Sequence, residues 1–263
     1  MTQPIIVSIS SGLSSALTYR RALDRYGVDC VQGVFMDTLI EDRDNYRFLD
    51  EIERWGQPFI RLTDGRDPYG VATDQHIIPN QKIAPCTFKL KIEPFRRYLA
   101  TQPPTVVCIG YDWTEIDRCA AVKRNYEGLG HTVDFPLLWK PYELRPYADV
   151  ARNEWGIEPP AMYAQGYSHA NCGGMCVKQG QGDWLRTLTY YPDRYARAET
   201  WEQEARSTGG PQADYALLRD QRGGTVKALT LRQLRERVEA GLDMQPLLTE
   251  QAPCISCGIG GIE

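Results

Sequence analysis

Short apolar runs alternate with amphipathic segments of helical periodicity through the first 130 residues, and no other feature constrains the fold as strongly. The apolar runs predicted to be strands are residues 4–10, 30–38, 59–64 and 105–112. The segments predicted to be helices are residues 14–27, 44–56, 86–100 and 117–130. Strands that are separated by helices pair in parallel, and the helices then cover both faces of the sheet.

The character of the chain changes near residue 145. Prolines punctuate the next stretch, a turn rich in glycine and cysteine follows, and the remaining segments are helical and rich in tyrosine and arginine. We therefore predict an α/β fold with a Rossmann-like parallel sheet over residues 1–145. A mainly helical, cysteine-rich C-terminal region is predicted over residues 146–263.

Charge and hydropathy restrict the class of protein. The net charge of -4 at pH 7 argues against a globally basic nucleic-acid binder, although local clusters of lysine and arginine can hold phosphate. No apolar run approaches the roughly 18 residues of a membrane span, and the N-terminus lacks the pattern of a signal peptide. We expect a cytoplasmic protein without membrane association. Its eight cysteines are then expected to be reduced, as metal ligands, catalytic thiols or core residues.

The turn after the first predicted strand reads SSGLSS, residues 10–15. Gly12 lets a phosphate approach the backbone, while the serine hydroxyls and the N-terminus of the next helix donate hydrogen bonds to it. Serines are also favoured helix caps, so an ordinary capped turn is the alternative interpretation. The turn alone does not decide between the two.

The same turn resembles the S-G-G-x-D-S signature of the PP-loop superfamily, which includes adenylating ATPases, sulfonucleotide reductases and DndC-like sulfur-transfer proteins. Ser10, Gly12 and Ser15 keep the pattern, whereas Ser11 replaces a glycine and Ser14 replaces the aspartate. Without this aspartate, the resemblance does not establish a Mg²⁺ ligand at the pyrophosphate.

Four further segments resemble motifs of this superfamily and occur in the same order, so that the resemblance extends over about residues 5–180. The matching residues are Asp37, Thr38 and Glu41 in VFMDTLIEDRDNYRFL, Cys86, Lys89 and Lys91 in PCTFKLKIEP, Gly110, Glu115 and Arg118 in GYDWTEIDR, and Cys172 and Cys176 in GYSHANCGGMC. The pattern is most similar to that of proteins like phosphoadenosine phosphosulfate (PAPS) reductase and to DndC-like proteins.

Two close pairs of cysteines stand out by their spacing. Cys172 and Cys176 form a C-x3-C pair, Cys254 and Cys257 form a C-x2-C pair, and both suit zinc or an iron–sulfur cluster. The resemblance implies a [4Fe–4S] cluster held by Cys86, the first pair and one member of the second pair, with zinc as the alternative metal. Unligated buried cysteines are the structural alternative.

The resemblance implies an ATP-dependent enzyme that cleaves ATP to AMP and pyrophosphate. It would adenylate a substrate for sulfur or nitrogen transfer, in nucleotide or nucleic-acid modification. The residues implied to bind the nucleotide are Ser10, Ser11, Gly12, Ser14, Ser15, Asp37, Thr38 and Gly110. The residues implied to act in catalysis are Ser10, Ser15, Lys89, Arg118 and Cys257.

Two alternative functions stay open. A sulfonucleotide reductase would take PAPS or adenosine phosphosulfate (APS), with Cys257 of SCGIGG as the nucleophile, although the glutamate and histidine of that motif are lost. A non-catalytic nucleotide- and metal-binding module of a larger assembly is the other. Expected partners are a tRNA, DNA or small-molecule acceptor, a sulfur-donor protein and a second copy of the chain. His169 is a candidate ligand or proton carrier, with a structural role as its alternative.

Overall fold

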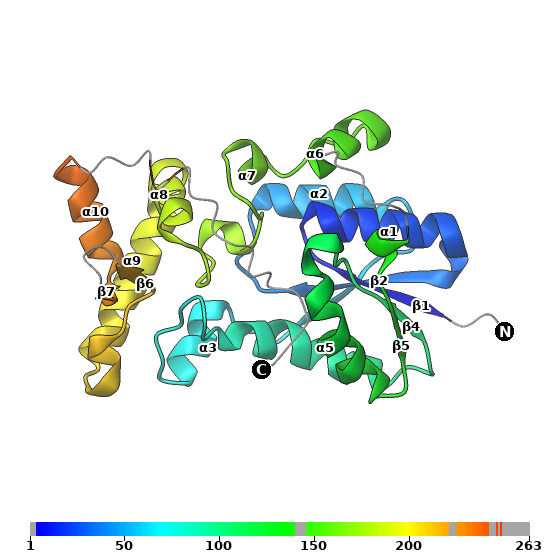
Figure 1. Ribbon diagram of the computed structural model, residues 1–263, viewed down its shortest axis with the longest axis horizontal. Coiled ribbons are helices and arrows are strands. Elements are labelled where there is room, and N and C mark those ends of the chain that lie inside the picture. The colour runs from blue at the N-terminus through cyan, green and yellow to red at the C-terminus, as the bar shows by residue number, and fades with distance from the viewer. Residues whose placement is uncertain (1–3, 140–145, 221–224, 242–245, 247, 249–263) are drawn as a thin grey trace.

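A five-stranded parallel sheet forms the centre of the fold in the computed structural model, which describes residues 4–139, 146–220, 225–241, 246 and 248. The strand order is β3-β2-β1-β4-β5 (Figure 1). The strands are β1 (Ile5–Ile9), β2 (Val31–Asp37), β3 (Ile60–Thr63), β4 (Val106–Cys108) and β5 (Thr132–Asp134). The predicted Rossmann-like α/β fold is confirmed. The short strand β5 was not predicted, because three residues carry no readable alternation.

Helices cover both faces of the sheet, and Figure 1 shows α1 and α2 on the opposite side from α5. The covering helices are α1 (Leu13–Tyr26), α2 (Arg43–Glu53), α4 (Glu93–Leu99) and α5 (Ile116–Glu127). Alternate side chains of a strand point to opposite faces. Val7 therefore packs in the cluster of α1 and α2, whereas Ile6 packs in the cluster of α4 and α5.

Two glycines determine where α1 lies. The helix ends at Gly27, as predicted, whose φ of 84° is open to glycine and whose N–H donates to the Leu23 carbonyl at 2.9 Å. At the other end, Gly110 follows β4 and touches α1. A Cβ on Gly110 would lie 2.9 Å from the Thr18 hydroxyl oxygen and 3.2 Å from the Ser14 carbonyl oxygen. Glycine at position 110 therefore lets the end of β4 approach the first turn of α1.

The predicted helix over residues 86–100 begins differently from an α-helix. Thr87–Ile92 form a wider, π-helical turn, and the α-helix α4 starts only at Glu93. Pro94 has no N–H to donate to the carbonyl four residues earlier, which disfavours continuous α-helical bonding there. Such turns change which side chains share a face, and they are frequent at functional sites.

The other elements of the first region are short and connect the sheet to its surroundings. They are the 3₁₀ turns Val28–Cys30, Trp113–Glu115 and Pro136–Leu138 and the helix α3 (Pro68–Asp74). After residue 146 come α6 (Tyr147–Val150), a π-helical turn Ala151–Trp155, α7 (Ala161–Ala164) and a 3₁₀ turn Cys172–Gly174.

In the residues described after 146, the C-terminal region is mainly helical, as predicted, and an antiparallel hairpin that was not predicted follows α9. Its elements are α8 (Gln181–Tyr190), α9 (Pro192–Ser207), a 3₁₀ turn Gly210–Asp214, β6 (Leu218–Asp220), β7 (Lys227–Leu229) and α10 (Leu231–Glu239). They share an apolar cluster with Ile40 and Tyr69 of the first region. Among the described residues we find no helix with the length and apolarity that a membrane crossing requires.

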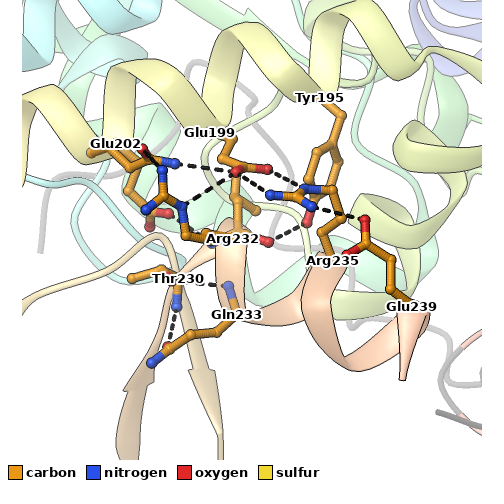
Figure 2. A network of polar contacts seen from close by, with 10 residues as sticks. Tyr195, Glu199, Glu202, Thr230, Arg232, Gln233, Arg235 and Glu239 are labelled. Atoms are coloured by element: carbon orange, nitrogen blue, oxygen red, sulfur yellow. Dashed lines mark hydrogen bonds and ion pairs between the residues drawn. The ribbon is translucent and has the colours of Figure 1, made fainter. Parts of the chain in front are cut away.

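A buried carboxylate on α9 joins this helix to its neighbours. Glu202 is fully buried, and its two oxygens accept the backbone N–H groups of Leu217 at 2.8 Å and Leu231 at 2.7 Å. Leu217 leads into β6, and Leu231 begins α10. Nearby, Figure 2 shows Glu199 bonded to Arg235 of α10, at 2.9 Å. The polar contacts of α9 therefore hold the hairpin and α10 together.

Replacing the buried carboxylate should destabilise the protein. We expect Glu202→Ala to lower the free energy of unfolding by about 2–6 kcal/mol, because it leaves two buried N–H groups without acceptors. Glu204→Ala, on the exposed side of the same helix, should change it by less than about 0.5 kcal/mol. Urea denaturation followed by circular dichroism measures both, and equal losses would contradict the assigned role of Glu202.

The same carboxylate predicts a pH dependence. Burial raises the pKa of Glu202 in the folded protein above its usual 4.5, against the lowering effect of the two N–H groups. The folded state therefore binds this proton more tightly, so its stabilising contribution is present below about pH 4.5 and is lost as the pH rises through the folded pKa. The stability of the wild type relative to Glu202→Gln should fall over this rise in pH, and a constant difference would contradict the prediction.

Candidate functional site

A pocket opens at the carboxyl ends of β1 and β4. It encloses about 870 Å³ including the part open to solvent. Chain connections leave β1 and β4 towards opposite edges of the sheet, because β1 is followed by β2 on one side and β4 by β5 on the other. Ligands of open parallel sheets bind at this switch point. The pocket therefore lies where the topology of the sheet predicts a ligand site.

The serine-rich turn forms one wall of the pocket and is closed by its own hydroxyl groups. Ser15 Oγ lies 2.7 Å from the Ser10 carbonyl oxygen, 2.9 Å from that of Gly12 and 3.1 Å from the Ser10 nitrogen. The Gly12 N–H donates to Ser10 Oγ at 3.3 Å. Ser10, Gly12, Ser14 and Ser15 all line the pocket. Ser15 shapes the turn, which presents its backbone to the pocket.

The N-terminus of α1 belongs to the same wall. Gly12 occupies the N-cap position and has no side chain to accept the first N–H groups of the helix. The hydroxyl of Tyr163, from α7, accepts the N–H of Leu13 at 3.3 Å and also lines the pocket. A helix N-terminus carries partial positive charge, so this end of the pocket favours an anion.

Glu41 joins three separate segments of the chain beside the pocket. One carboxylate oxygen accepts the Cys172 N–H at 2.8 Å, the Asn45 amide at 3.1 Å and the Ser11 hydroxyl at 3.4 Å. The other accepts the Thr38 hydroxyl at 3.1 Å. Glu41 also lines the pocket. The serine-rich turn, the loop after β2 and the turn at Cys172 are thus held by one carboxylate.

Ser11, which the resemblance aligns with a glycine of the PP-loop signature, lies outside the pocket lining. It is 1% exposed and donates to the Ala170 carbonyl at 3.1 Å. Asn45 donates to the same carbonyl at 2.6 Å. The predicted nucleotide ligand Ser11 therefore has a structural role in the folded protein, because its hydroxyl is used to attach the segment around Ala170.

Among the basic residues predicted for the site, Lys91 lines the pocket, whereas Lys89 and Arg118 do not. Lys89 pairs with Glu93 at 3.3 Å and lies over the ring of Phe88. Both lysines belong to the π-helical turn, and residues two apart do not share a side of a helix, so only one of them faces the pocket.

Arg118 contacts residues of the pocket lining. It pairs with Glu115, which lines the pocket, and lies 4.4 Å from the centre of the Tyr111 ring. Gly110 and Tyr111 line the pocket directly. Arg118 therefore supports two residues of the lining and does not itself contribute to it.

The two predicted nucleotide ligands at the end of β2, Asp37 and Thr38, also lie outside the lining. Asp37 accepts the Tyr46 hydroxyl at 2.7 Å and the Leu39 N–H at 2.8 Å, so its carboxylate closes the loop. Thr38 is buried and donates to Glu41. Phe35 and Met36 line the pocket in their place.

Three of the predicted metal ligands pack against one apolar cluster. Cys172 is buried in it, and Cys86 and Cys176 are partly buried against it. None of the three lines the pocket. Cys254 and Cys257 lie outside the described residues. Within the described ranges, no three histidine, cysteine or acidic side chains gather to hold a metal, so these residues do not by themselves form the predicted ligand set.

The segment before Cys172 contributes lining residues that motif spacing did not assign to the site. Tyr163 and Asn171 line the pocket, and no signature pointed to either. His169 lines it as well, and burial lowers its pKa below 6.5. Its candidate role came only from its residue type and its position before a cysteine pair. These residues reach the pocket through tertiary packing of the C-terminal region, which a sequence motif does not reveal.

No protein-family model matches this sequence, and a search of curated proteins finds no significant match.

Removing the carboxylate that joins the three segments should be costly. We expect Glu41→Ala to lower the free energy of unfolding by about 2–4 kcal/mol, because the buried Cys172 N–H and Thr38 hydroxyl lose their acceptor. The matched control is Glu51→Ala, which removes a partly exposed pair with Arg47 at 3.1 Å and should cost about 0.3–0.5 kcal/mol. Urea denaturation of both variants checks this, and a cost for Glu41→Ala no larger than for the control would refute it.

Proposed function

We propose that the protein is a PP-loop-type enzyme that binds ATP in this pocket and cleaves it between the α and β phosphates. The product would be an adenylated acceptor, prepared for replacement of an oxygen by sulfur or nitrogen. One observation carries the proposal: the serine-rich turn, the N-terminus of α1 and Lys91 meet in one pocket at the switch point of the sheet.

The arrangement suits the charge that develops during this reaction. Pyrophosphate leaves with added negative charge, and N–H groups at a helix N-terminus together with a lysine ammonium stabilise such charge. The hydroxyls of Ser10 and Ser14 are further donors in the lining. Gly12, without a side chain, leaves room for a phosphate against the backbone of the turn.

The proposal also includes the acceptor that becomes adenylated and the source of the sulfur. A nucleobase of tRNA or DNA, a free nucleotide and a small metabolite are the acceptor classes, with a sulfur-donor protein or a second copy of the chain as partner. The ligand set Cys86, Cys172, Cys176 and one of Cys254 or Cys257 belongs to the sulfur-transfer branch of the proposal. No catalytic step is assigned to a metal there.

The direct test is to identify the products formed from ATP. The purified full chain is incubated with α-labelled ATP and Mg²⁺, alone and with tRNA, DNA or nucleosides, and AMP, ADP and pyrophosphate are separated. AMP with equimolar pyrophosphate supports the proposal, and ADP overturns it. Tight ATP binding without any AMP favours the non-catalytic module, while sulfite release from PAPS or APS with a thiol reductant favours the reductase.

The two neighbouring lysines provide a matched test of the site. We expect Lys91→Ala to weaken ATP binding about tenfold to hundredfold, because a charge-assisted contact in the pocket is lost. Lys89→Ala, which removes a partly exposed pair with Glu93, should weaken it less than about threefold. Isothermal titration with α,β-methylene-ATP measures both affinities. A larger effect at Lys89 would show that the phosphates bind elsewhere.

A further inference from the structure

His169 carries a buried, unpartnered nitrogen in the wall of the candidate ATP pocket. The residue lines the pocket, and within the described part of the chain its Nε2 atom has no hydrogen-bond partner. Leaving a buried polar nitrogen unpaired is unfavourable. A ligand in the adjoining pocket can supply the missing partner, so the imidazole is a candidate contact for the reacting groups.

The backbone around His169 is attached to the serine-rich turn and to its support. The carbonyl of Ala170, the next residue, accepts the hydroxyl of Ser11 and the amide of Asn45. The N–H of Cys172 donates to Glu41 at 2.8 Å. The imidazole is therefore mounted on the elements that form the proposed phosphate site, which preorganises it relative to a bound nucleotide.

We propose that His169 is a catalytic residue that accepts the proton lost by the acceptor as its oxygen bonds to the α-phosphorus of ATP. This inference rests on the proposed function and adds to it a reacting group and a class of acceptor.

The proposed step is a substitution at the α-phosphorus of ATP. The acceptor oxygen forms a bond to the α-phosphorus, and the bond from that phosphorus to the α,β-bridging oxygen breaks. Pyrophosphate leaves with the electron pair, and the proton of the acceptor passes to the imidazole of His169 and from there to solvent. A carboxylate acceptor has no proton to lose at neutral pH. A base here therefore indicates a hydroxyl or a lactam, in which a carbonyl adjoins a ring N–H, as in several nucleobases.

The other charged groups of the lining are poorly suited to take this proton. They are Glu41, Lys91 and Glu115. Glu41 already accepts four hydrogen bonds, Glu115 is paired with Arg118, and an ammonium has no lone pair. Burial lowers the pKa of His169, which keeps the imidazole neutral at pH 7 and able to accept a proton.

The kinetic test uses water as the hydroxyl acceptor and follows AMP release from ATP. We expect His169→Gln to release AMP at least about thirtyfold more slowly while the Kd for ATP changes less than about threefold. For His169→Ala, added imidazole should raise the rate of AMP release at least about tenfold, which a merely structural role would not allow. His76→Asn, at an exposed histidine outside the pocket, is the control and should keep the wild-type rate.

A second measurement follows the imidazole itself and needs no turnover. The chain has three histidines, so their ring signals can be assigned by NMR from single variants. Saturating α,β-methylene-ATP should shift the His169 signal and raise its pKa, because an anionic phosphate nearby favours the imidazolium. The signals of His76 and His131 are the internal reference.

The outcomes separate the two proposals. ATP binding with an unmoved His169 signal, or AMP release by His169→Gln at the wild-type rate, overturns the role of His169 and leaves the proposed function standing. No ATP binding by the wild type overturns the proposed function and this inference with it. A shifted signal together with imidazole rescue supports both.

Discussion

The carboxylate of Glu41 is the contact on which the candidate site depends. It is the shared acceptor for the turn after β1, the loop after β2 and the turn at Cys172, three segments that no single element connects. The Cys172 N–H and the Thr38 hydroxyl would otherwise be buried without a partner. Because an unpaired buried donor is costly, Glu41 stabilises the arrangement in which the three segments meet.

The same contact gives the Ser11 hydroxyl a structural role. It donates to the Ala170 carbonyl at 3.1 Å and lies 3.4 Å from a carboxylate oxygen of Glu41. A glycine at position 11 would leave that carbonyl to Asn45 alone. Ser11 therefore joins the N-terminal turn to the C-terminal region, and it is not part of the pocket lining.

Most of the fold was predictable, because it follows from local patterns. The strands around Val7 and Val34, the helix that stops at Gly27 and the position of the turn at the end of β1 all follow from periodicity and glycine placement. The short strand β5, helix α3 and the π-helical turn at Thr87–Ile92 were not predicted. Elements of this length carry too few residues to show a period.

The sequence by itself determined the parallel sheet, its covering helices and the position of the serine-rich turn between strand and helix, since each depends on residues close together in the chain. Only the tertiary structure decided which side chains line the pocket. Lys89 and Lys91 both belong to a π-helical turn that no periodicity revealed, and of the two only Lys91 lines the pocket. Likewise His169 joins the site through a contact between Ser11 and Ala170, 159 residues apart. Contacts at such separation depend on how whole elements pack, because local propensity holds no information about them.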